Sequence, residues 1–306
     1  MKILVTGGGG FLGAWVIQRL LKRNVAVRVL DSNPDRSVVA SIVGAAADAV
    51  EWVVGDVSDA VCVGQSMRGC DGVVHLAGLL TPACQDDPVR GAMVNLVGTL
   101  HVFEAAKTHG IAQVVYTSSV SVFGQDDGVT PCPSTHYGAF KLATEGCART
   151  YWAYDRIASI GIRPGVVYGP GREQGLTAGP TLACKAAVRG EPYTIGYTGE
   201  TCLVYVDDVA AAYEAAVLAP LAGAQVLNLS GSPVSTAAVI TEIARHCPAA
   251  AITATGDRVP FTAHISDRQA YETFPQLTRT SLEDGIKRTL DYYRECEAQS
   301  HPSPAI

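Results

Sequence analysis

A glycine-rich turn near the N-terminus is the feature that most constrains the fold of this chain. The run is Thr6-Gly7-Gly8-Gly9-Gly10-Phe11-Leu12-Gly13, and it joins a short apolar segment (Lys2–Val5) to an amphipathic, helix-like stretch (Phe11–Arg23). Its glycines at 7, 10 and 13 permit a tight strand-to-helix turn whose backbone approaches a pyrophosphate at the positive end of the helix dipole. The turn therefore predicts a dinucleotide-binding domain built on a parallel sheet.

The first half of the chain continues this alternation of short β-branched runs and longer helical stretches. Such alternation is typical of a parallel sheet covered by helices on both faces, so we predict an α/β fold with a Rossmann-type doubly wound sheet. The length of 306 residues allows one large domain of this kind, or one such domain with a smaller appendage. The Pro-containing tail, 301–306, is expected to fray. Further expected strands are Val25–Leu30, Glu51–Val54, Val73–Leu76, Gln113–Thr117, Ala158–Ile162, Leu203–Val206 and Val226–Leu229, and further helices are Pro88–His109, Thr135–Tyr154, Thr181–Arg189, Asp207–Leu218, Ser235–Arg245 and Ser281–Glu297.

Composition excludes several classes of function. The hydrophobic share of 48% and the charged share of 17% support a large core, and a net charge of −6 without any Lys/Arg run argues against nucleic acid as a partner. No apolar segment is long enough to cross a membrane, so a soluble cytoplasmic protein is expected. The 9 cysteines include no Cys-x-x-Cys pair, which favours free thiols and no metal site.

Side chains at the ends of three expected strands indicate how the cofactor binds. Asp31 ends the second strand, where a carboxylate accepts hydrogen bonds from the adenosine ribose and repels a 2′-phosphate; this favours NAD over NADP, although Arg28 and Arg36 lie nearby. Asp56-Val57 follows the third strand, and Asp56 can accept from the adenine amino group or cap the next helix. Leu76-Ala77-Gly78 ends the fourth strand, where small residues let a cofactor lie across the sheet edge, and His75 before them is expected to be packed.

The reacting groups are expected to be Ser119, Tyr137 and Lys141. Ser119 follows the fifth strand, at the edge where open α/β sheets bind ligands. Tyr137 and Lys141 are four residues apart on a helix and therefore share one face. An ammonium group and an oxidised nicotinamide both favour the phenolate, so Tyr137 can act as a base while Ser119 holds the substrate oxygen.

These motifs resemble the extended short-chain dehydrogenase/reductase family, the NAD-dependent epimerase/dehydratase group. The resemblance covers most of the chain. The matching segments are Thr6–Gly13, Asp56-Val57, His75–Gly78, Val94-Asn95-Leu96-Val97-Gly98-Thr99, Thr117–Gly124, Tyr137–Lys141, Arg163-Pro164-Gly165, Val167-Tyr168-Gly169-Pro170-Gly171 and Val206–Ala210.

The resemblance implies further roles for individual residues. Lys141 would also bind the nicotinamide ribose, Asn95 and Thr117 would belong to the cofactor site, and Pro164-Gly165-Val166 would lie beside the nicotinamide ring. It also implies a smaller C-terminal substrate domain, so that residues 1–165 and about 201–231 form the NAD-binding Rossmann domain and about 166–200 with 232–306 form the substrate-binding subdomain. It further implies a homodimer formed through a four-helix bundle of Pro88–His109 and Thr135–Tyr154.

Departures from the family pattern indicate which reaction is expected. Nucleotide-sugar dehydratases carry Asp-Glu after the reactive Ser/Thr, whereas Val120-Ser121 stands here; sugar-nucleotide epimerases usually carry Asn where Val166 stands. We therefore predict an NAD-dependent dehydrogenase that oxidises a secondary hydroxyl of a small sugar, uronic acid or polyhydroxy acid. The alternatives are a nucleotide-sugar 4-epimerase with tightly bound NAD, similar to UDP-glucose 4-epimerase, and a regulator that binds a dinucleotide without turnover. Expected substrate contacts are Thr81, Ser119, Ser121, Tyr137, Arg172, Gln174 and Thr177. Arg172 can bind a carboxylate, pair with Glu173 or anchor its loop.

Overall fold

A seven-stranded sheet forms the centre of the larger part of the molecule in the computed structural model, which describes residues 1–300. The strand order is β10-β6-β5-β4-β1-β2-β3, and every neighbouring pair is parallel. This confirms the predicted Rossmann-type sheet; the predicted fraying of 301–306 lies outside the described residues. The strands are β1 (Lys2–Thr6), β2 (Ala26–Asp31), β3 (Glu51–Val54), β4 (Gly72–His75), β5 (Gln113–Thr117), β6 (Ala158–Pro164) and β10 (Ala224–Leu229).

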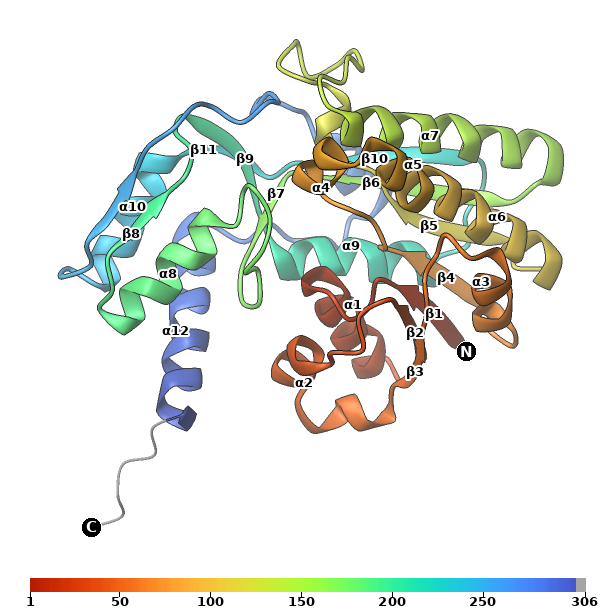
Figure 1. Ribbon diagram of the computed structural model, residues 1–306, viewed down its shortest axis with the longest axis horizontal. Helices are drawn as coiled ribbons and strands as arrows, with labels where there is room; N and C mark the ends of the chain where they lie inside the picture. Colours follow the sequence, from red (N-terminus) through yellow and green to blue (C-terminus); the bar gives the residue numbers. More distant parts are fainter. Residues whose placement is uncertain (301–306) are drawn as a thin grey trace.

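Helices cover both faces of this sheet (Figure 1). On one face α1 (Phe11–Lys22) packs against α2 (Ser37–Val43) and α9 (Val206–Leu218); on the other α3 (Ala60–Met67) packs against α6 (Gly98–His109), and α6 against α7 (His136–Asp155). Alternate residues of one strand enter different cores, since Ile3 and Val5 belong to the first and Leu4 to the second. Both faces are therefore buried, which explains why the strands are apolar without polar alternation.

Two predicted helices differ in detail from the observed ones. The stretch 88–109 is α5 (Pro88–Ala92), a π-helical turn (Met93–Val97) and α6 in succession. Helix α7 begins one residue later than predicted because Thr135 caps it, its hydroxyl accepting from the Gly138 amide at 3.1 Å. Shorter helical segments for which the sequence predicted no range include α2, α3, η1 (Gly44–Ala49), α4 (Thr81–Asp86) and η3 (Val120–Val122).

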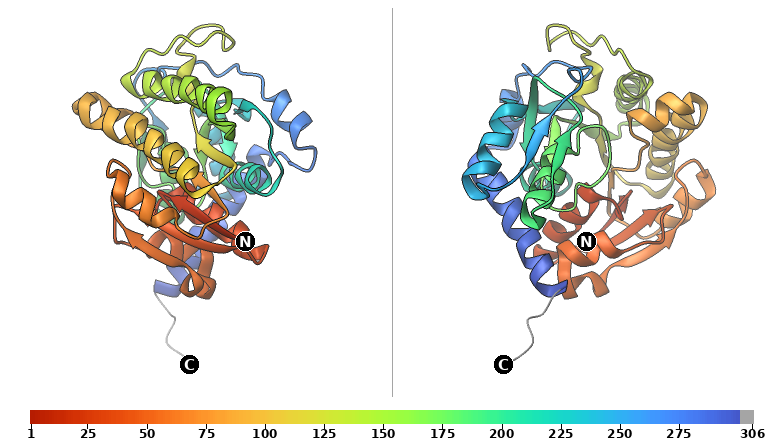
Figure 2. Two further views of the ribbon diagram at one scale, coloured as in Figure 1. Left: turned by 90° about the vertical axis from the view of Figure 1, so that its right-hand side faces the viewer. Right: turned by 60° about the vertical axis from the view of Figure 1, so that its left-hand side comes forward.

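A smaller part of the molecule lies beside the carboxyl end of the sheet (Figures 1 and 2). It holds a three-stranded sheet in the order β11-β9-β7 and a β12-β8 pair. Three of these strands have only three residues, too few for a hydrophobic period to be recognised. Its elements are β7 (Val166–Tyr168), α8 (Gly179–Arg189), β8 (Tyr193–Ile195), β9 (Glu200–Tyr205), β11 (Ser232–Ser235), α10 (Thr236–His246), β12 (Ile252–Ala254), α11 (Arg268–Thr273) and α12 (Leu282–Ser300).

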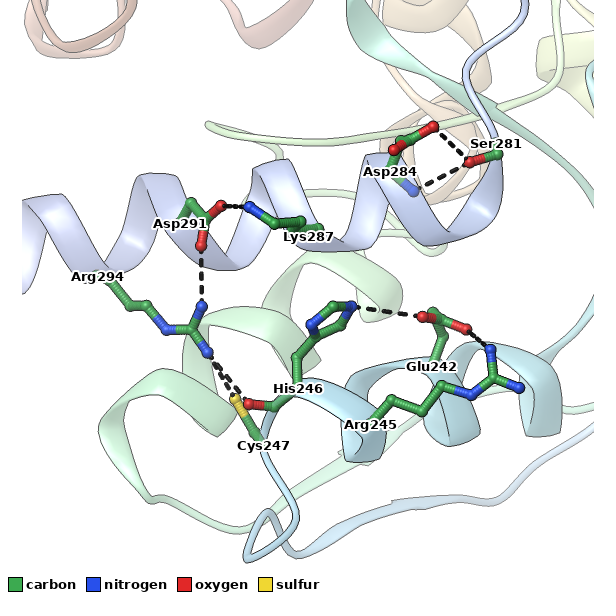
Figure 3. Close-up of polar contacts among 9 residues, drawn as sticks. All are labelled: Glu242, Arg245, His246, Cys247, Ser281, Asp284, Lys287, Asp291 and Arg294. Carbon is green, nitrogen blue, oxygen red and sulfur yellow. Dashed lines mark hydrogen bonds and ion pairs between the residues drawn. The ribbon is translucent and has the colours of Figure 1, made fainter.

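Polar contacts attach the C-terminal helix α12 to α10, as Figure 3 shows. Arg294 donates to Asp291 at 2.9 Å on its own helix and to the carbonyl of His246 at 3.2 Å, at the end of α10. Ser281 precedes α12, and its hydroxyl accepts from the Asp284 amide at 3.1 Å. None of the helices in residues 1–300 is both long enough and apolar enough to cross a bilayer.

Candidate active site

The parallel strands bring the predicted site residues to one edge of the large sheet. Asp31 ends β2, Leu76-Ala77-Gly78 follows β4, Ser119 follows β5, and Pro164-Gly165-Val166 spans the junction of β6 and β7. Because neighbouring parallel strands end on the same side, these segments form a common rim together with the glycine turn after β1.

The glycine turn is packed closely and leaves the start of α1 available to an anion. Gly7 has φ +68°, and a Cβ there would lie 2.6 Å from the Ala77 amide nitrogen; one on Gly13 would lie 2.6 Å from Gly8 Cα. Gly10 occupies the N-cap of α1, where no side chain caps the helix, and the first turn carries no acidic residue. The uncapped N–H groups of a helix start suit a pyrophosphate, so these residues fit the predicted dinucleotide.

Asp31 is held at the end of β2 above this turn. Its carboxylate accepts from the Gly9 and Asn33 amides, each at 2.9 Å. The two arginines near it in sequence are engaged elsewhere: Arg36 lies 4.9 Å above the Trp52 ring, and Arg28 pairs with Glu51 at 2.8 Å. The region around Asp31 therefore fits an unphosphorylated ribose.

Asp56 binds side chains and an amide of its own loop and does not cap helix α3. Its carboxylate accepts from the amide and hydroxyl of Ser58, each at 2.8 Å, and from Arg90. Helix α3 is capped instead by Asp59, which accepts from the Val61 amide at 2.9 Å. The predicted capping role of Asp56 is therefore wrong, because the chain turns once more before α3 begins. Val57 is buried and lies against Gly98 of α6.

Ser119 and Tyr137 are brought together by a close approach of two backbones. Ser119 caps η3, its hydroxyl accepting from the Ser121 amide at 3.1 Å. A Cβ on Gly138 would lie 2.4 Å from the Ser121 carbonyl oxygen, so only glycine lets the first turn of α7 sit this close. The Tyr137 phenol consequently lies against the Ser119 hydroxyl.

Lys141 is buried one turn further along α7. Its Nζ lies 5.6 Å from the centre of the Tyr137 ring and donates to the Thr117 carbonyl at 2.8 Å. Burial lowers the pKa of Lys141 to about 8. Among the described residues no carboxylate pairs with Lys141.

The pKa of Tyr137 in this structure is raised, because burial disfavours the phenolate. The Ser119 hydroxyl and the Arg172 guanidinium act in the opposite direction and lower it. Arg172 is thus a second protein cation that favours the phenolate, in addition to the nearby Lys141 that the spacing of the motif suggests. No local pattern could signal this, since Arg172 and Tyr137 are 35 positions apart (172 − 137).

Asn95 and Cys84 line the site beside Lys141. The Asn95 amide nitrogen donates to the Leu79 and Gly91 carbonyls, each at 3.1 Å, and to the Cys84 sulfur at 3.2 Å. The Asn95 Oδ1 is buried without a hydrogen-bond partner and lies against Gly78. This acceptor is available to a ligand or a water. Cys84, a buried thiol, was not predicted for the site because a lone cysteine is usually a small apolar residue of the core.

His75 and Thr117 form a buried network under the site. His75 shares hydrogen bonds with the hydroxyls of Thr6 (2.6 Å) and Thr99 (3.0 Å), and burial, with a contribution from Lys141, lowers its pKa to about 3. His75 is therefore a neutral, packed residue, as predicted. The Thr117 hydroxyl lies 2.7 Å from that of Tyr213.

The expected substrate residues come from two segments. Thr81 begins α4, whereas Arg172, Gln174 and Thr177 lie on the loop between β7 and α8. In residues 1–300 no hydrogen bond joins Gln174 or Thr177 to the reacting groups, and Gln174 is exposed. Only Arg172 of this loop approaches Tyr137; Tyr197, which was not predicted, is buried beside Arg172.

Comparisons with known proteins agree with this geometry. The model of a family described as "NAD dependent epimerase/dehydratase family" matches residues 3–230. UDP-glucose 4-epimerase from Mycolicibacterium smegmatis is 30% identical over 96% of this chain and 99% of its own. The crystal structure of UDP-glucose 4-epimerase from Thermus thermophilus in complex with NAD superposes with a TM-score of 0.82 at 25% identity, covering 96% of this chain and 99% of that one. MoeE5 in complex with UDP-glucuronic acid and NAD gives a TM-score of 0.81 at 26% identity, covering 97% and 100%.

Proposed function

The chain belongs to the NAD-dependent epimerase/dehydratase family, and we propose that it is a nucleotide-sugar 4-epimerase that keeps NAD bound through turnover. The observation that carries this proposal is the convergence of Ser119, Tyr137 and Lys141 at the rim of the sheet, in a chain similar over nearly its whole length to a UDP-glucose 4-epimerase. The dehydrogenase predicted from the sequence is unconfirmed, and the comparisons favour the epimerase that was its alternative.

In this proposal residues 1–165 and about 201–231 form the cofactor-binding part, and the remainder forms the substrate-binding subdomain. The strand β9 (Glu200–Tyr205) is an exception, since it pairs with β7 and β11 of the smaller sheet. The glycine turn and α1 hold the pyrophosphate, Asp31 holds the adenosine ribose, and Lys141 donates to the nicotinamide ribose. Pro164-Gly165-Val166 lies beside the nicotinamide.

Each reacting residue then has one task. Ser119 donates a hydrogen bond to the C4 oxygen of the sugar, and Tyr137 takes the proton from that oxygen. Bound NAD supplies the hydride acceptor that oxidises C4 and later the donor that reduces it. When the sugar presents its other face, Tyr137 returns the proton to the same oxygen, so no net oxidation occurs.

A dehydrogenase remains the second candidate because of Val166. This side chain is 3% exposed and apolar at the position where the epimerases carry the asparagine that helps to hold the nucleotide sugar. Without that amide the site has one polar contact fewer for a nucleotide sugar, and a smaller substrate does not need that contact.

One experiment separates the two. The purified protein is incubated with UDP-glucose and with a panel of free sugars, uronates and hydroxy acids, with and without added NAD. An epimerase yields UDP-galactose without added NAD and accumulates no reduced cofactor. Accumulation of reduced cofactor in proportion to a free sugar or acid identifies a dehydrogenase and refutes the epimerase.

We also propose a homodimer through the 88–109 segment and α7, because α5, the π-helical turn and α7 each carry an exposed apolar side chain. Val89 is 75% exposed, Met93 39% and Tyr154 85%. Light scattering should give twice the mass of one chain, and Val89→Glu should lower it; a monomeric wild type refutes this interface.

A further inference from the structure

Arg172 is placed over the cofactor end of the site by the loop that follows β7. The Trp15 indole donates to the Pro170 carbonyl at 3.0 Å, and Gly171 lies against Phe11, so the loop is fastened to α1. The Arg172 guanidinium lies 5.6 Å from the centre of the Phe11 ring. Its position is therefore fixed by the loop before any ligand binds.

Arg172 lacks the counter-charge that comparable arginines have. Arg19, Arg28, Arg163 and Arg172 are the partly buried arginines in residues 1–300, and the first three each form an ion pair. No carboxylate of the described residues lies within 4.0 Å of the Arg172 guanidinium, and its Nε is buried without a hydrogen-bond partner.

The carboxylate of the next residue, Glu173, is not the counter-charge of Arg172. Glu173 pairs with Lys185 at 2.7 Å and accepts from the Tyr293 hydroxyl at 3.3 Å, which excludes the Arg172–Glu173 ion pair considered from the sequence. A partly buried cation without a partner destabilises a folded protein, and such groups concentrate where a ligand supplies the missing charge.

The surroundings of Arg172 point to the reacting end of the substrate. The groups that act electrostatically on its charge are the phenols of Tyr137 and Tyr197. A Cβ on Gly175 would lie 3.2 Å from an Arg172 terminal nitrogen and 3.0 Å from Leu80, which precedes Thr81. The guanidinium thus lies among the residues expected to contact the sugar, on the same side as Tyr137.

We propose that Arg172 is a specificity-determining residue that binds a carboxylate on the sugar ring, so that the preferred substrate is a nucleotide-linked uronic acid. This rests on the epimerase function proposed above. The planar guanidinium offers two parallel N–H groups to the two carboxylate oxygens, a geometry that a neutral hydroxymethyl group cannot match. A cofactor pyrophosphate or a substrate diphosphate shares this anionic chemistry, and Phe11 belongs to the glycine turn assigned to the pyrophosphate, so the test below distinguishes these groups from a sugar carboxylate.

The test compares wild type, Arg172→Met and Arg172→Lys on UDP-glucuronic acid and UDP-glucose, with NAD affinity measured separately. We expect wild type to prefer UDP-glucuronic acid, and Arg172→Met to lower its kcat/KM about 100-fold or more while UDP-glucose loses far less. NAD affinity should not change. Arg68→Met, which removes an exposed arginine charge at the end of α3, is the matched control and should behave as wild type.

Three results overturn the proposal. If Arg172→Met loses equal activity on both substrates, Arg172 binds the substrate diphosphate. If the variant binds NAD more weakly, Arg172 binds the cofactor pyrophosphate. If wild type prefers UDP-glucose, Arg172 does not select a substrate carboxylate. If neither nucleotide sugar is converted, the epimerase function fails, and calorimetry with NAD and free glucuronate then tests Arg172 alone. Wild type should bind glucuronate more tightly than glucose, Arg172→Met should lose this preference, and its absence in wild type refutes the site.

A stability measurement guards against a purely structural explanation. Because Arg172→Met removes a cation that has no carboxylate partner in the described residues, and methionine can still pack on the Phe11 ring, the variant without ligand should melt at the same or a higher temperature than wild type. Loss of glucuronate binding together with a lower melting temperature in both Arg172→Met and Arg172→Lys would assign Arg172 to the fold and not to the substrate.

Discussion

Replacing Lys141 with methionine should stabilise the ligand-free protein at neutral pH while abolishing its activity. Lys141 is 3% exposed, has no carboxylate partner in the described residues and has its pKa lowered by burial from 10.5 to about 8. The unfolded chain therefore binds a proton more readily than the folded chain between about pH 8 and pH 10.5. Below about pH 8 the full cost of burying the ammonium is present, and it disappears as the pH rises to about 10.5.

The size of the effect follows from these values. At about 1.4 kcal/mol for each pKa unit, the drop from 10.5 to about 8 corresponds to about 3 kcal/mol. Methionine also loses the hydrogen bond from Nζ to the Thr117 carbonyl, which costs about 1 kcal/mol. The net gain for Lys141→Met is about 2 kcal/mol at pH 7, or about 3 °C in melting temperature for a chain of this length.

Urea unfolding at several pH values between about 7 and 10 measures this difference. The stability gap between Lys141→Met and wild type should shrink as the pH rises and should vanish or reverse near about pH 10. Lys22→Met, at an exposed position on α1, is the control and should show no such trend. A variant less stable than wild type at neutral pH, or a gap that does not change with pH, would refute the burial of an uncompensated ammonium.

Further predictions concern the other site residues and one buried ion pair. Tyr137→Phe should lower kcat by about a hundredfold or more with NAD affinity retained, and near-normal turnover in a steady-state assay would remove Tyr137 from the proton-transfer role. Asp31→Ala combined with a basic neighbour should shift cofactor preference towards NADP; a wild type that already binds NADP more tightly in fluorescence titrations contradicts the ribose assignment. Gly13→Ala should destabilise the protein by about 1–3 kcal/mol in urea unfolding and weaken NAD binding, because its Cβ would meet the Gly8 backbone. Glu145→Gln leaves the Arg163 guanidinium without its charge partner and should lower the free energy of unfolding by about 3 kcal/mol. An unchanged urea midpoint would argue against a buried ion pair.

The sequence predicted the cofactor half well because each of its signals is local. The strand, glycine turn and helix of the cofactor site are contiguous in the sequence. The carboxyl ends of parallel strands lie at one edge of the sheet regardless of loop conformation, so Asp31 and Ser119 could be placed on one rim. The smaller sheets were harder to predict, since β7, β8 and β12 span three residues each and are stabilised by partners distant in the chain. Their existence depends on tertiary contacts and leaves no period in the sequence.

The electrostatics of the site could not be predicted from spacing, because they depend on which charges the fold leaves uncompensated. The Tyr-x-x-x-Lys spacing predicts that Lys141 stands beside Tyr137, and its Nζ lies 5.6 Å from the ring centre. Burial, however, disfavours the charged form of both groups, and the distant Arg172 adds a second cation that lowers the pKa of the phenol. A buried cation, Lys141, and a partly buried one, Arg172, thus flank one phenol, and neither has a carboxylate partner in residues 1–300. This arrangement destabilises the ligand-free folded state. It strengthens the binding of a ligand that brings oxygen acceptors to Lys141 and negative charge to Arg172. The part of the free energy of folding that this arrangement removes is therefore available to ligand binding, which is why the stability of the Lys141 and Arg172 variants without ligand, measured beside their activity, tests the site more directly than activity alone.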